Sequence, residues 1–405
     1  MRILVLCDRF PWPLTNGQNL RIYHYINALK ERHQFDLLCY GDAQSVPAEI
    51  VPLFGRIDCS PKPAAEKFTG VRKLWSAFDL NQFVLKCPTT THKIFRWQQE
   101  QPYDLIWVSG WDMIVNIPPA LGVPVLMDAV DDGLLEHRRE VQTAPSLKRR
   151  LRALKLLWMN YRFEKRYFAP QEGVLFVSER DAASFQTIAP KTKVSVVHNG
   201  VDTDFFAPLG LPKRRHTMIF EGNISFAPNL DGLRYFCAEI LPLIQARCPD
   251  VALQVVGRDP PPEIQALATG KIGAPGIAVT GFVDDVRPYL DQATLFVCPL
   301  RKGAGIKNKL LQAWSIGLPV VATSITLGGL KAEPEKNVVV ADTPEDFAAA
   351  VLRLLDDADL CQRLSTHARA TALDHYSWRQ KAAELETVMA TVAGTPPLPR
   401  GGGGE

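Results

Sequence analysis

Glycines and cationic side chains lie close together between residues 299 and 309. The stretch reads Pro-Leu-Arg-Lys-Gly-Ala-Gly-Ile-Lys-Asn-Lys, follows an apolar run at 294–298 and leads into a helical pattern. The start of a helix presents unpaired backbone N–H groups and the positive end of the helix dipole. Glycine lets the backbone approach an anion closely, and Arg301, Lys307 and Lys309 add positive charge. This combination predicts a diphosphate site; the alternative is a glycine-rich turn with solvated lysines.

The elements that must position this stretch follow from the hydrophobic pattern. Short, continuously apolar runs alternate with longer segments of helical periodicity, which indicates parallel sheets covered by helices on both faces. Right-handed crossovers then give an α/β, doubly wound fold. We expect strands at 2–7, 35–40, 104–108, 123–127, 173–178, 194–198, 217–221, 251–256, 277–280, 294–298, 319–322 and 337–340, and helices at 18–31, 230–247, 304–316 and 344–356.

The chain length and a break in the pattern predict two domains. A chain of 405 residues is long for one core, and the strand pattern restarts after a Pro-, Gly- and charge-rich connector at 207–215. We therefore expect an N-terminal Rossmann-like domain at 1–205 and a C-terminal one at 206–376. Ligands of open parallel sheets bind beyond the carboxyl ends of the strands, so two facing sheets would form an interdomain cleft.

The C-terminal end of the chain has two expected parts. Ser377-Trp378-Arg379-Gln380 is a capping-box pattern that opens a last helix, 377–393, which we expect to contribute to the first domain. Residues 394–405 are rich in Pro and Gly and have almost nothing to bury, so we expect a disordered tail.

Composition excludes several classes of protein. The net charge of +3 gives no indication of nucleic-acid binding, and no apolar run approaches the length of a membrane span. The apolar residues after Met1 indicate a first strand and not a signal peptide, so we expect a cytoplasmic protein. The eight cysteines form no CxxC pair and are interpreted as free thiols in a reducing compartment, with no zinc cluster. We expect no metal at Asp202-Thr203-Asp204, which lies in the linker.

Residues 299–323 resemble the donor-site signature of family 4 (group 1) glycosyltransferases. The likeness is to the bacterial PLRxGxGxKxK branch linked to exopolysaccharide synthesis. Phe220-Glu221-Gly222-Asn223, His198-Asn199-Gly200-Val201-Asp202 and Gly281-Phe282-Val283 fall in the order of the family's motifs. The resemblance implies a GT-B fold and transfer of a sugar, with retention and without a metal, to a glycan or lipid-linked acceptor hydroxyl. The donor would be a nucleotide sugar, with UDP or GDP favoured, and no cofactor is implied.

The resemblance also implies roles for single residues. Arg301, Lys307 and Asp131 would be catalytic. The residues implied in donor binding are Gly303, Ala304, Gly305, Ile306, Lys309, Gln312, Phe282, Val283, Asn223 and Arg258. Gln312 departs from the family, because a glutamate usually accepts the ribose hydroxyls there, and the loss of charge predicts weaker ribose binding. Ala304 replaces a second glutamate that helps place the donor sugar, which leaves the sugar undefined.

The N-terminal half is expected to supply the acceptor side. Asn16-Gly17 looks like the family's glycine loop, although a simple strand–helix turn is the alternative. Family members usually carry a histidine after the strand at 123–127, and this chain has none before His137. Asp131 or Asp128 would take that role as an acceptor for sugar hydroxyls; a solvated loop carboxylate is the alternative.

The segment 146–168 is basic and amphipathic. It holds eight Lys and Arg residues against Glu164, with leucines and aromatic residues between them. Such a helix either lies on an anionic membrane, here the inner face of the plasma membrane, or packs on the first domain with a solvated basic face.

Two rivals to a transferase remain from the sequence. A nucleotide-sugar 2-epimerase shares the fold but needs acid/base groups near the sugar, and Ala304, Gln312 and the missing histidine argue against it. A non-catalytic nucleotide-binding scaffold is consistent with the same substitutions.

Overall fold

The chain forms two compact α/β units. The computed structural model describes residues 1–14, 16–41, 46–64, 79–118, 120–268, 270, 272, 275–302 and 307–394, without the side chains at 81, 82 and 136. The first unit comprises residues 1–198 and 381–405, and the second comprises 199–380. The division thus falls a few residues before the connector at 207–215.

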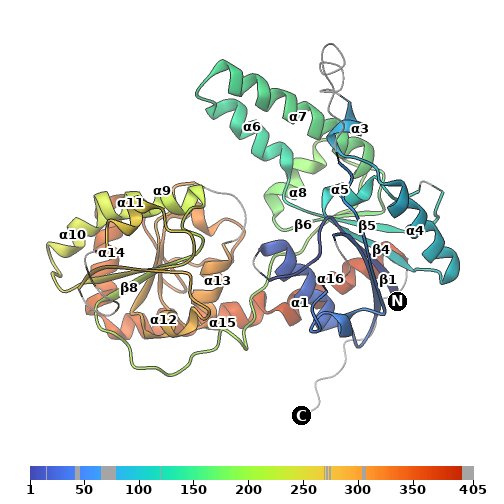
Figure 1. The fold of residues 1–405 in the computed structure, drawn as a ribbon. Helices are drawn as coiled ribbons and strands as arrows, with labels where there is room; N and C mark the ends of the chain where they lie inside the picture. The colour runs from blue at the N-terminus through green and yellow to red at the C-terminus, as the bar shows by residue number, and fades with distance from the viewer. Residues whose placement is uncertain are drawn as a thin grey trace. The chain divides into compact units, whose positions relative to one another are not determined.

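The first unit is built on a parallel sheet. Its described strands lie in the order β3-β2-β1-β4-β5-β6-β7 (Figure 1). Every registered pair in it is parallel. The strands are β1 (Arg2–Cys7), β2 (Gln34–Tyr40), β3 (Arg56–Ser60), β4 (Leu105–Ser109), β5 (Val125–Val130), β6 (Gly173–Phe176) and β7 (Val194–Val196).

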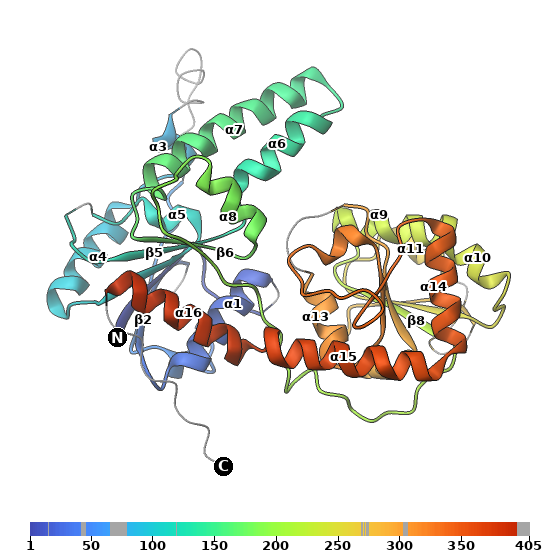
Figure 2. The same ribbon diagram turned by 180° about the vertical axis from the view of Figure 1, so that it is seen from behind.

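Helices cover both faces of this sheet. Helices α4, α7 and α8 lie on one face and α1 and α16 on the other, as Figures 1 and 2 show. Most apolar side chains of the strands between these helices are almost fully buried, so water is excluded from both faces of the sheet. The helices are α1 (Gly17–Leu29), η2 (Val51–Leu53), α3 (Leu80–Phe83), α4 (Pro88–Glu100), α5 (Trp111–Ile114), α6 (Gly133–Thr143), α7 (Leu147–Tyr167), α8 (Glu179–Gln186) and α16 (Trp378–Ala393).

The second unit repeats the design. Its described strands form a parallel sheet in the order β10-β9-β8-β11-β12-β13. In each sheet the chain first adds strands on one side of the first strand and then adds the remaining strands on its other side. This is the doubly wound arrangement. The strands are β8 (Thr217–Glu221), β9 (Ala252–Val256), β10 (Gly276–Gly281), β11 (Leu295–Cys298), β12 (Val320–Ala322) and β13 (Val339–Val340).

Helices again flank the sheet of the second unit. Helices α9, α10 and α14 lie on one face, and α13 and α15 on the other (Figures 1 and 2). The helices are α9 (Ala227–Tyr235), η3 (Phe236–Ile240), α10 (Leu241–Gln245), α11 (Pro262–Gln265), α12 (Arg287–Gln292), α13 (Asn308–Ser315), η4 (Ser324–Leu327), α14 (Pro344–Asp356) and α15 (Ala358–Tyr376).

Helix α13 begins at Asn308 and not at 304 as expected. Two further elements differ from the sequence prediction for physical reasons. The single helix expected at 230–247 is interrupted by the π-helical turn η3, which ends just before Pro242. Proline has no N–H for the helical ladder and its ring crowds the preceding turn, so a local change of winding accommodates it. Strand β3 was missed because its residues Arg56–Ser60 mix charged and apolar side chains, as edge strands do. No helix among the described residues is long and apolar enough to cross a membrane.

Candidate functional site

The switch point of the second sheet lies between β8 and β11. These strands pair in parallel at Leu295↔Met218 and Phe296↔Ile219, while the chain continues from each to opposite halves of the sheet. In such folds the ligand crevice opens beyond the carboxyl ends of the two strands. Glu221 ends β8 and Cys298 ends β11, so the segments that follow them lie at this position.

Arg301, which follows β11, is held by Asp231 of α9. Its Nε and Nη2 atoms donate to the two carboxylate oxygens at 3.2 Å each, and Lys302 Nζ donates to the same carboxylate at 3.1 Å. The guanidinium also lies over the ring of Tyr235, 4.5 Å from its centroid. Burial raises the pKa of the Asp231 carboxyl, but the hydrogen bonds from Arg301 and Lys302 outweigh it, and the net pKa lies below its ordinary value. The cation is therefore oriented beside the switch point.

Lys309 is anchored by the protein itself. Its Nζ donates to the backbone oxygen of Glu221 at 2.7 Å and to Asn229 Oδ1 at 2.9 Å, and it lies 4.3 Å from the ring centroid of Phe220. Burial lowers the pKa of the Lys309 ammonium, although Glu221 acts against this. Lys309, expected at the donor phosphate, thus ties α13 to the end of β8.

Two glycines allow the backbones after β8 and β9 to touch. A Cβ on Gly257 would lie 1.7 Å from the Gly222 oxygen, and both residues have positive φ, +148° and +140°. Asn229 Nδ2 donates to the Asn223 oxygen at 2.7 Å, which closes the turn after β8. The side chain of Asn223, predicted to bind the donor, accepts hydrogen bonds from Ser225, with 3.1 Å to N and 2.8 Å to Oγ.

The other half of the carboxyl edge carries an exposed aromatic ring. Phe282 directly follows β10 and is 71% exposed, whereas Val283 is partly buried against the core. Arg258 follows Gly257 at the end of β9, and its side chain is 44% exposed with Nε 4.0 Å from Asp259 Oδ2. An exposed aromatic ring and a partly exposed cation at one sheet edge are groups that a nucleotide base and a phosphate could contact.

Part of the predicted site lies outside the described residues. Gly303, Ala304, Gly305 and Ile306 are not among them, so the predicted backbone cradle is not described. Lys307 is the N-cap residue of α13, and Gln312 is partly buried on the next turns of that helix.

The first unit corrects one expectation. Asp128 cannot contact a sugar, because its carboxylate accepts a 2.9 Å hydrogen bond from Arg21 Nε and both side chains are fully buried. Asp131 is exposed just after β5. Asn16 uses its side chain to cap α1, accepting from Asn19 N at 2.9 Å, and Gly17 is the first residue of that helix.

Helix α7 packs on the first unit through one side and exposes an apolar stripe on another. Its buried residues include Met159 and Phe163, which lie in the core of that unit. With α6 it forms a hairpin that extends from the sheet (Figure 1). The stripe has residues spaced alternately by four and three and comprises Leu147, Leu151, Leu154, Trp158 and Tyr161, which are 72, 57, 43, 43 and 38% exposed.

Asp231, Asn229 and Tyr235 were not predicted as site residues. Asp231 and Tyr235 stand at the i, i+4 spacing that places two side chains on one helix face. That spacing was the available signal, but nothing in the sequence showed that α9 lies beside the loop after β11.

Comparisons with known proteins agree with this architecture. A model described as "Glycosyl transferases group 1" matches residues 215–357, and one described as "Glycosyltransferase Family 4" matches 15–205. Phosphatidyl-myo-inositol mannosyltransferase from Mycolicibacterium smegmatis is 26% identical over 316 residues, which is 76% of each chain.

Solved structures show the same fold. Sucrose-phosphate synthase from Thermosynechococcus elongatus superposes with a TM-score of 0.70 at 17% identity, covering 97% of this chain and 99% of that one. Anabaena HepE in complex with UDP superposes with a TM-score of 0.66 at 16% identity, covering 96% and 100%. Two parallel-sheet units with these likenesses define an α/β glycosyltransferase of GT-B fold. The chain belongs to the group 1, or family 4, glycosyltransferases.

Proposed function

We propose that this glycosyltransferase moves a sugar from a nucleoside diphosphate donor to a glycan or lipid-linked acceptor hydroxyl, with retention and without a catalytic metal. A single observation carries the donor assignment: Asp231 orients the cationic side chain of Arg301 at the β8–β11 switch point. A UDP or GDP donor is supported by two similar proteins. Anabaena HepE was solved in complex with UDP, and a Mycolicibacterium smegmatis relative is a GDP-mannose-dependent mannosyltransferase.

The chain's own cations would stabilise the leaving diphosphate. As the glycosidic bond breaks, negative charge grows on the leaving phosphate oxygen, and preorganised donors lower the barrier most where that charge develops. Arg301 is already oriented, and Lys307 lies at the first turn of α13, where the helix dipole adds to its charge. The same oxygen would accept the proton of the acceptor hydroxyl, which balances the transfer without a separate base. Asp131 would accept hydrogen bonds from sugar hydroxyls.

The nucleoside would lie along the carboxyl edge. Phe282 offers a ring for the base, with Val283 beside it, and Gln312 offers an acceptor for ribose hydroxyls. Because the Gln312 side chain is neutral, its contribution to binding is smaller than that of a carboxylate by about 1 kcal/mol.

A donor panel tests the proposed reaction. The purified chain is incubated with UDP-, GDP- and dTDP-sugars, with and without a lipid-linked oligosaccharide fraction, and the released nucleoside diphosphate is measured with and without EDTA. We expect release that requires acceptor and persists in EDTA, and NMR of the product should show the donor's anomeric configuration. Tight nucleotide binding without release would identify a scaffold, and exchange at the sugar C2 an epimerase.

Lys307→Ala tests the diphosphate assignment itself. We expect it to weaken nucleoside diphosphate binding, whereas Lys336→Ala, which removes an exposed lysine paired with Glu333, should not. Unchanged affinity in Lys307→Ala would refute the assignment.

We also propose that the chain contacts an anionic membrane through 146–168. The exposed apolar stripe of α7 is flanked by eight cationic side chains, and the helix's single carboxylate, Glu164, is buried. Apolar insertion and attraction to anionic lipid act together on such a surface. Co-sedimentation should occur with vesicles containing anionic phospholipid and fall for Leu151→Asp and for zwitterionic vesicles. Binding that is indifferent to both changes would overturn this part of the proposal.

A further inference from the structure

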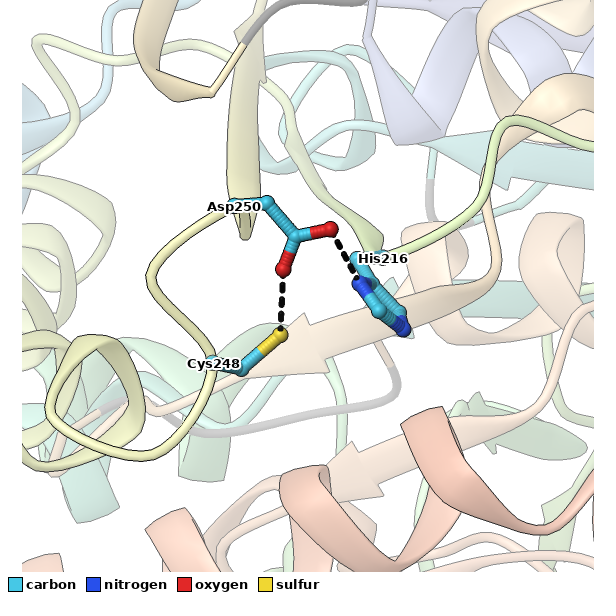
Figure 3. Close-up of side chains that lie close together, drawn as sticks. All are labelled: His216, Cys248 and Asp250. Atoms are coloured by element: carbon cyan, nitrogen blue, oxygen red, sulfur yellow. Dashed lines mark hydrogen bonds and ion pairs between the residues drawn. The ribbon is translucent and has the colours of Figure 1, made fainter.

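Three potential metal ligands meet at the amino-terminal edge of the second sheet. His216 directly precedes β8, and Cys248 and Asp250 lie in the turn before β9 (Figure 3). Asp250 bridges the other two: His216 Nδ1 lies 2.7 Å from its Oδ2, and Cys248 Sγ lies 3.2 Å from its Oδ1. One nitrogen, one sulfur and one oxygen atom all lie within 4.8 Å of one another.

Backbone hydrogen bonds fix the residues that carry these side chains. The backbone of His216 accepts a 2.9 Å hydrogen bond from Ala252 N, which fixes the start of β8 against the start of β9. Cys248 N donates to the Ile244 oxygen at 2.8 Å, and Val251 N donates to the Cys248 oxygen at 3.2 Å. The backbone segments that carry the three ligands are therefore fixed against one another, which favours a preorganised site.

We propose that His216, Cys248 and Asp250 bind one Zn²⁺-like divalent cation, with water as the fourth ligand. Imidazole nitrogen, thiolate sulfur and carboxylate oxygen form a donor set that suits zinc. Zn–S and Zn–N bonds of about 2.3 and 2.0 Å place tetrahedral ligand atoms roughly 3.3–3.6 Å apart. The Cys248–Asp250 pair already has nearly this spacing, and the His216–Asp250 pair must open by about 0.6 Å.

The different exposure of the three ligands indicates where water would complete the coordination. Cys248 is 9% exposed and the side chain of His216 is 12% exposed, whereas that of Asp250 is 63% exposed. A cation between them would thus have protein on one side and solvent on the other, which leaves room for water. The charged neighbours are Asp356 at the end of α14, which favours a cation, and Arg215, which opposes it.

Binding of the cation must release one proton, move a second one within the His216 ring and break one contact. Burial, together with the hydrogen bond to Asp250, raises the pKa of the Cys248 thiol to about 11, so the thiol keeps its proton without a cation. Coordination releases that proton to solvent. Arg215 Nε lies 3.2 Å from His216 Nε2, which needs an unprotonated Nε2. Coordination through Nδ1 moves the ring proton to Nε2, so Arg215 must turn away.

The site would be structural and distinct from the donor site. The donor residues lie at the carboxyl end of β8, about 16 Å along the strand from His216. A cation there would clamp the starts of β8 and β9, and the inference does not depend on the proposed transferase reaction.

Metal titration of the full, tag-free chain tests the proposal. One equivalent of Co²⁺ should bind and give a thiolate-to-cobalt charge-transfer band. Zn²⁺ should displace the Co²⁺. Calorimetry of Zn²⁺ binding in two buffers should show the release of one proton. Cys248→Ser should abolish the band and weaken Zn²⁺ binding by at least about tenfold. Cys237→Ser, which alters a thiol outside the cluster, should change neither.

Two further variants guard against misfolding. Asp250→Asn changes an exposed side chain and should weaken Zn²⁺ binding without lowering the Tm of the metal-free chain. Arg215→Ala should tighten Zn²⁺ binding, since it removes the opposing charge. If His216, Cys248 and Asp250 only hydrogen-bond to one another, no such gain is expected. Absence of the band, or a band that survives in Cys248→Ser, would overturn the proposal.

Discussion

Arg301 and Asp231 form a two-point ion pair, with both N···O distances 3.2 Å, that joins the loop after β11 to helix α9. The pair spans the switch point of the second sheet, so the carboxylate fixes where the guanidinium points. Asp231 is thus a positioning residue, while Arg301 is the group proposed to contact the donor. Separate substitutions distinguish the two roles.

Arg301→Ala should lower kcat/KM for the donor by about 100-fold, the typical loss when one group that stabilises developing charge is removed. Asp231→Asn should raise the donor KM several-fold with a smaller effect on kcat, because the guanidinium remains but is less well oriented. Steady-state kinetics with the best donor of the panel checks both.

The melting temperature provides the control for this pair. Exposed ion pairs contribute at most about 1 kcal/mol to stability, so both variants should melt near the parent protein. Equal losses of kcat in Asp231→Asn and Arg301→Ala would contradict a positioning role.

Gln312→Glu should tighten nucleotide binding about fivefold. A carboxylate accepts a charge-assisted hydrogen bond that is stronger by about 1 kcal/mol than the one an amide accepts. Calorimetry with the nucleoside diphosphate measures the change. Gln312→Ala is the matched variant and should weaken binding; if Glu weakens it as much as Ala does, the side chain does not face the ribose.

Phe282→Ala should raise the donor KM about tenfold without changing the melting temperature. The ring is 71% exposed, so little core packing is lost, whereas stacking on a base contributes about 1–3 kcal/mol. Phe95→Ala, which removes a 47% exposed ring from the first unit, should leave the donor KM unchanged. A fall in Tm with no change in KM would assign Phe282 to packing.

Gly257→Ala should destabilise the second unit by about 2–4 kcal/mol. The new Cβ would meet the Gly222 oxygen at 1.7 Å in a backbone with φ of +148°. Thermal or urea unfolding measures the loss. Gly328→Ala is the control, since its Cβ would enter open space, and it should change stability by less than about 0.5 kcal/mol.

The strands were predictable because buried parallel strands are continuously apolar. β1 and β8 begin and end at the residues the hydrophobic runs indicated, or within one residue of them. β3 was not predictable in this way, because Asp58 and Arg56 interrupt its apolar pattern at the edge of the sheet. The break at η3 depends on how Pro242 is accommodated, which sequence periodicity does not show.

Single site residues were harder to predict than the region they occupy. The sequence indicated cations after β11, but the partner of Arg301 is 70 residues away in the chain. Lys309 was expected at the donor phosphate from its type and spacing, but the sequence did not show that the fold brings the Glu221 oxygen and Asn229 to it. Likewise His216 and Cys248 are far apart in sequence and meet only because β8 pairs with β9.

The root of the α6–α7 hairpin contains two buried carboxyl groups. Glu164 on α7 is 1% exposed and Asp132, the N-cap residue of α6, is 3% exposed. Neither Glu164 oxygen has a hydrogen-bond donor among the described residues. Burial first, and then the Asp132 carboxylate, raise the pKa of Glu164 to about 9, with Arg138 acting in the opposite direction. A proton on Glu164 would satisfy both groups.

This arrangement predicts a pH-dependent stability. In the unfolded chain Glu164 loses its proton near the ordinary pKa of about 4.3, whereas the folded chain keeps it to about pH 9. Stability therefore falls as pH rises through this window, by up to about 1.4 kcal/mol per pH unit for one proton. Glu164→Gln removes the titrating group, so its gain in Tm should be larger at pH 8 than at pH 5. Glu49→Gln, at an exposed position, is the control and should show no such pH dependence. A gain in Tm for Glu164→Gln that is equal at both pH values would show that the folded chain does not hold the proton.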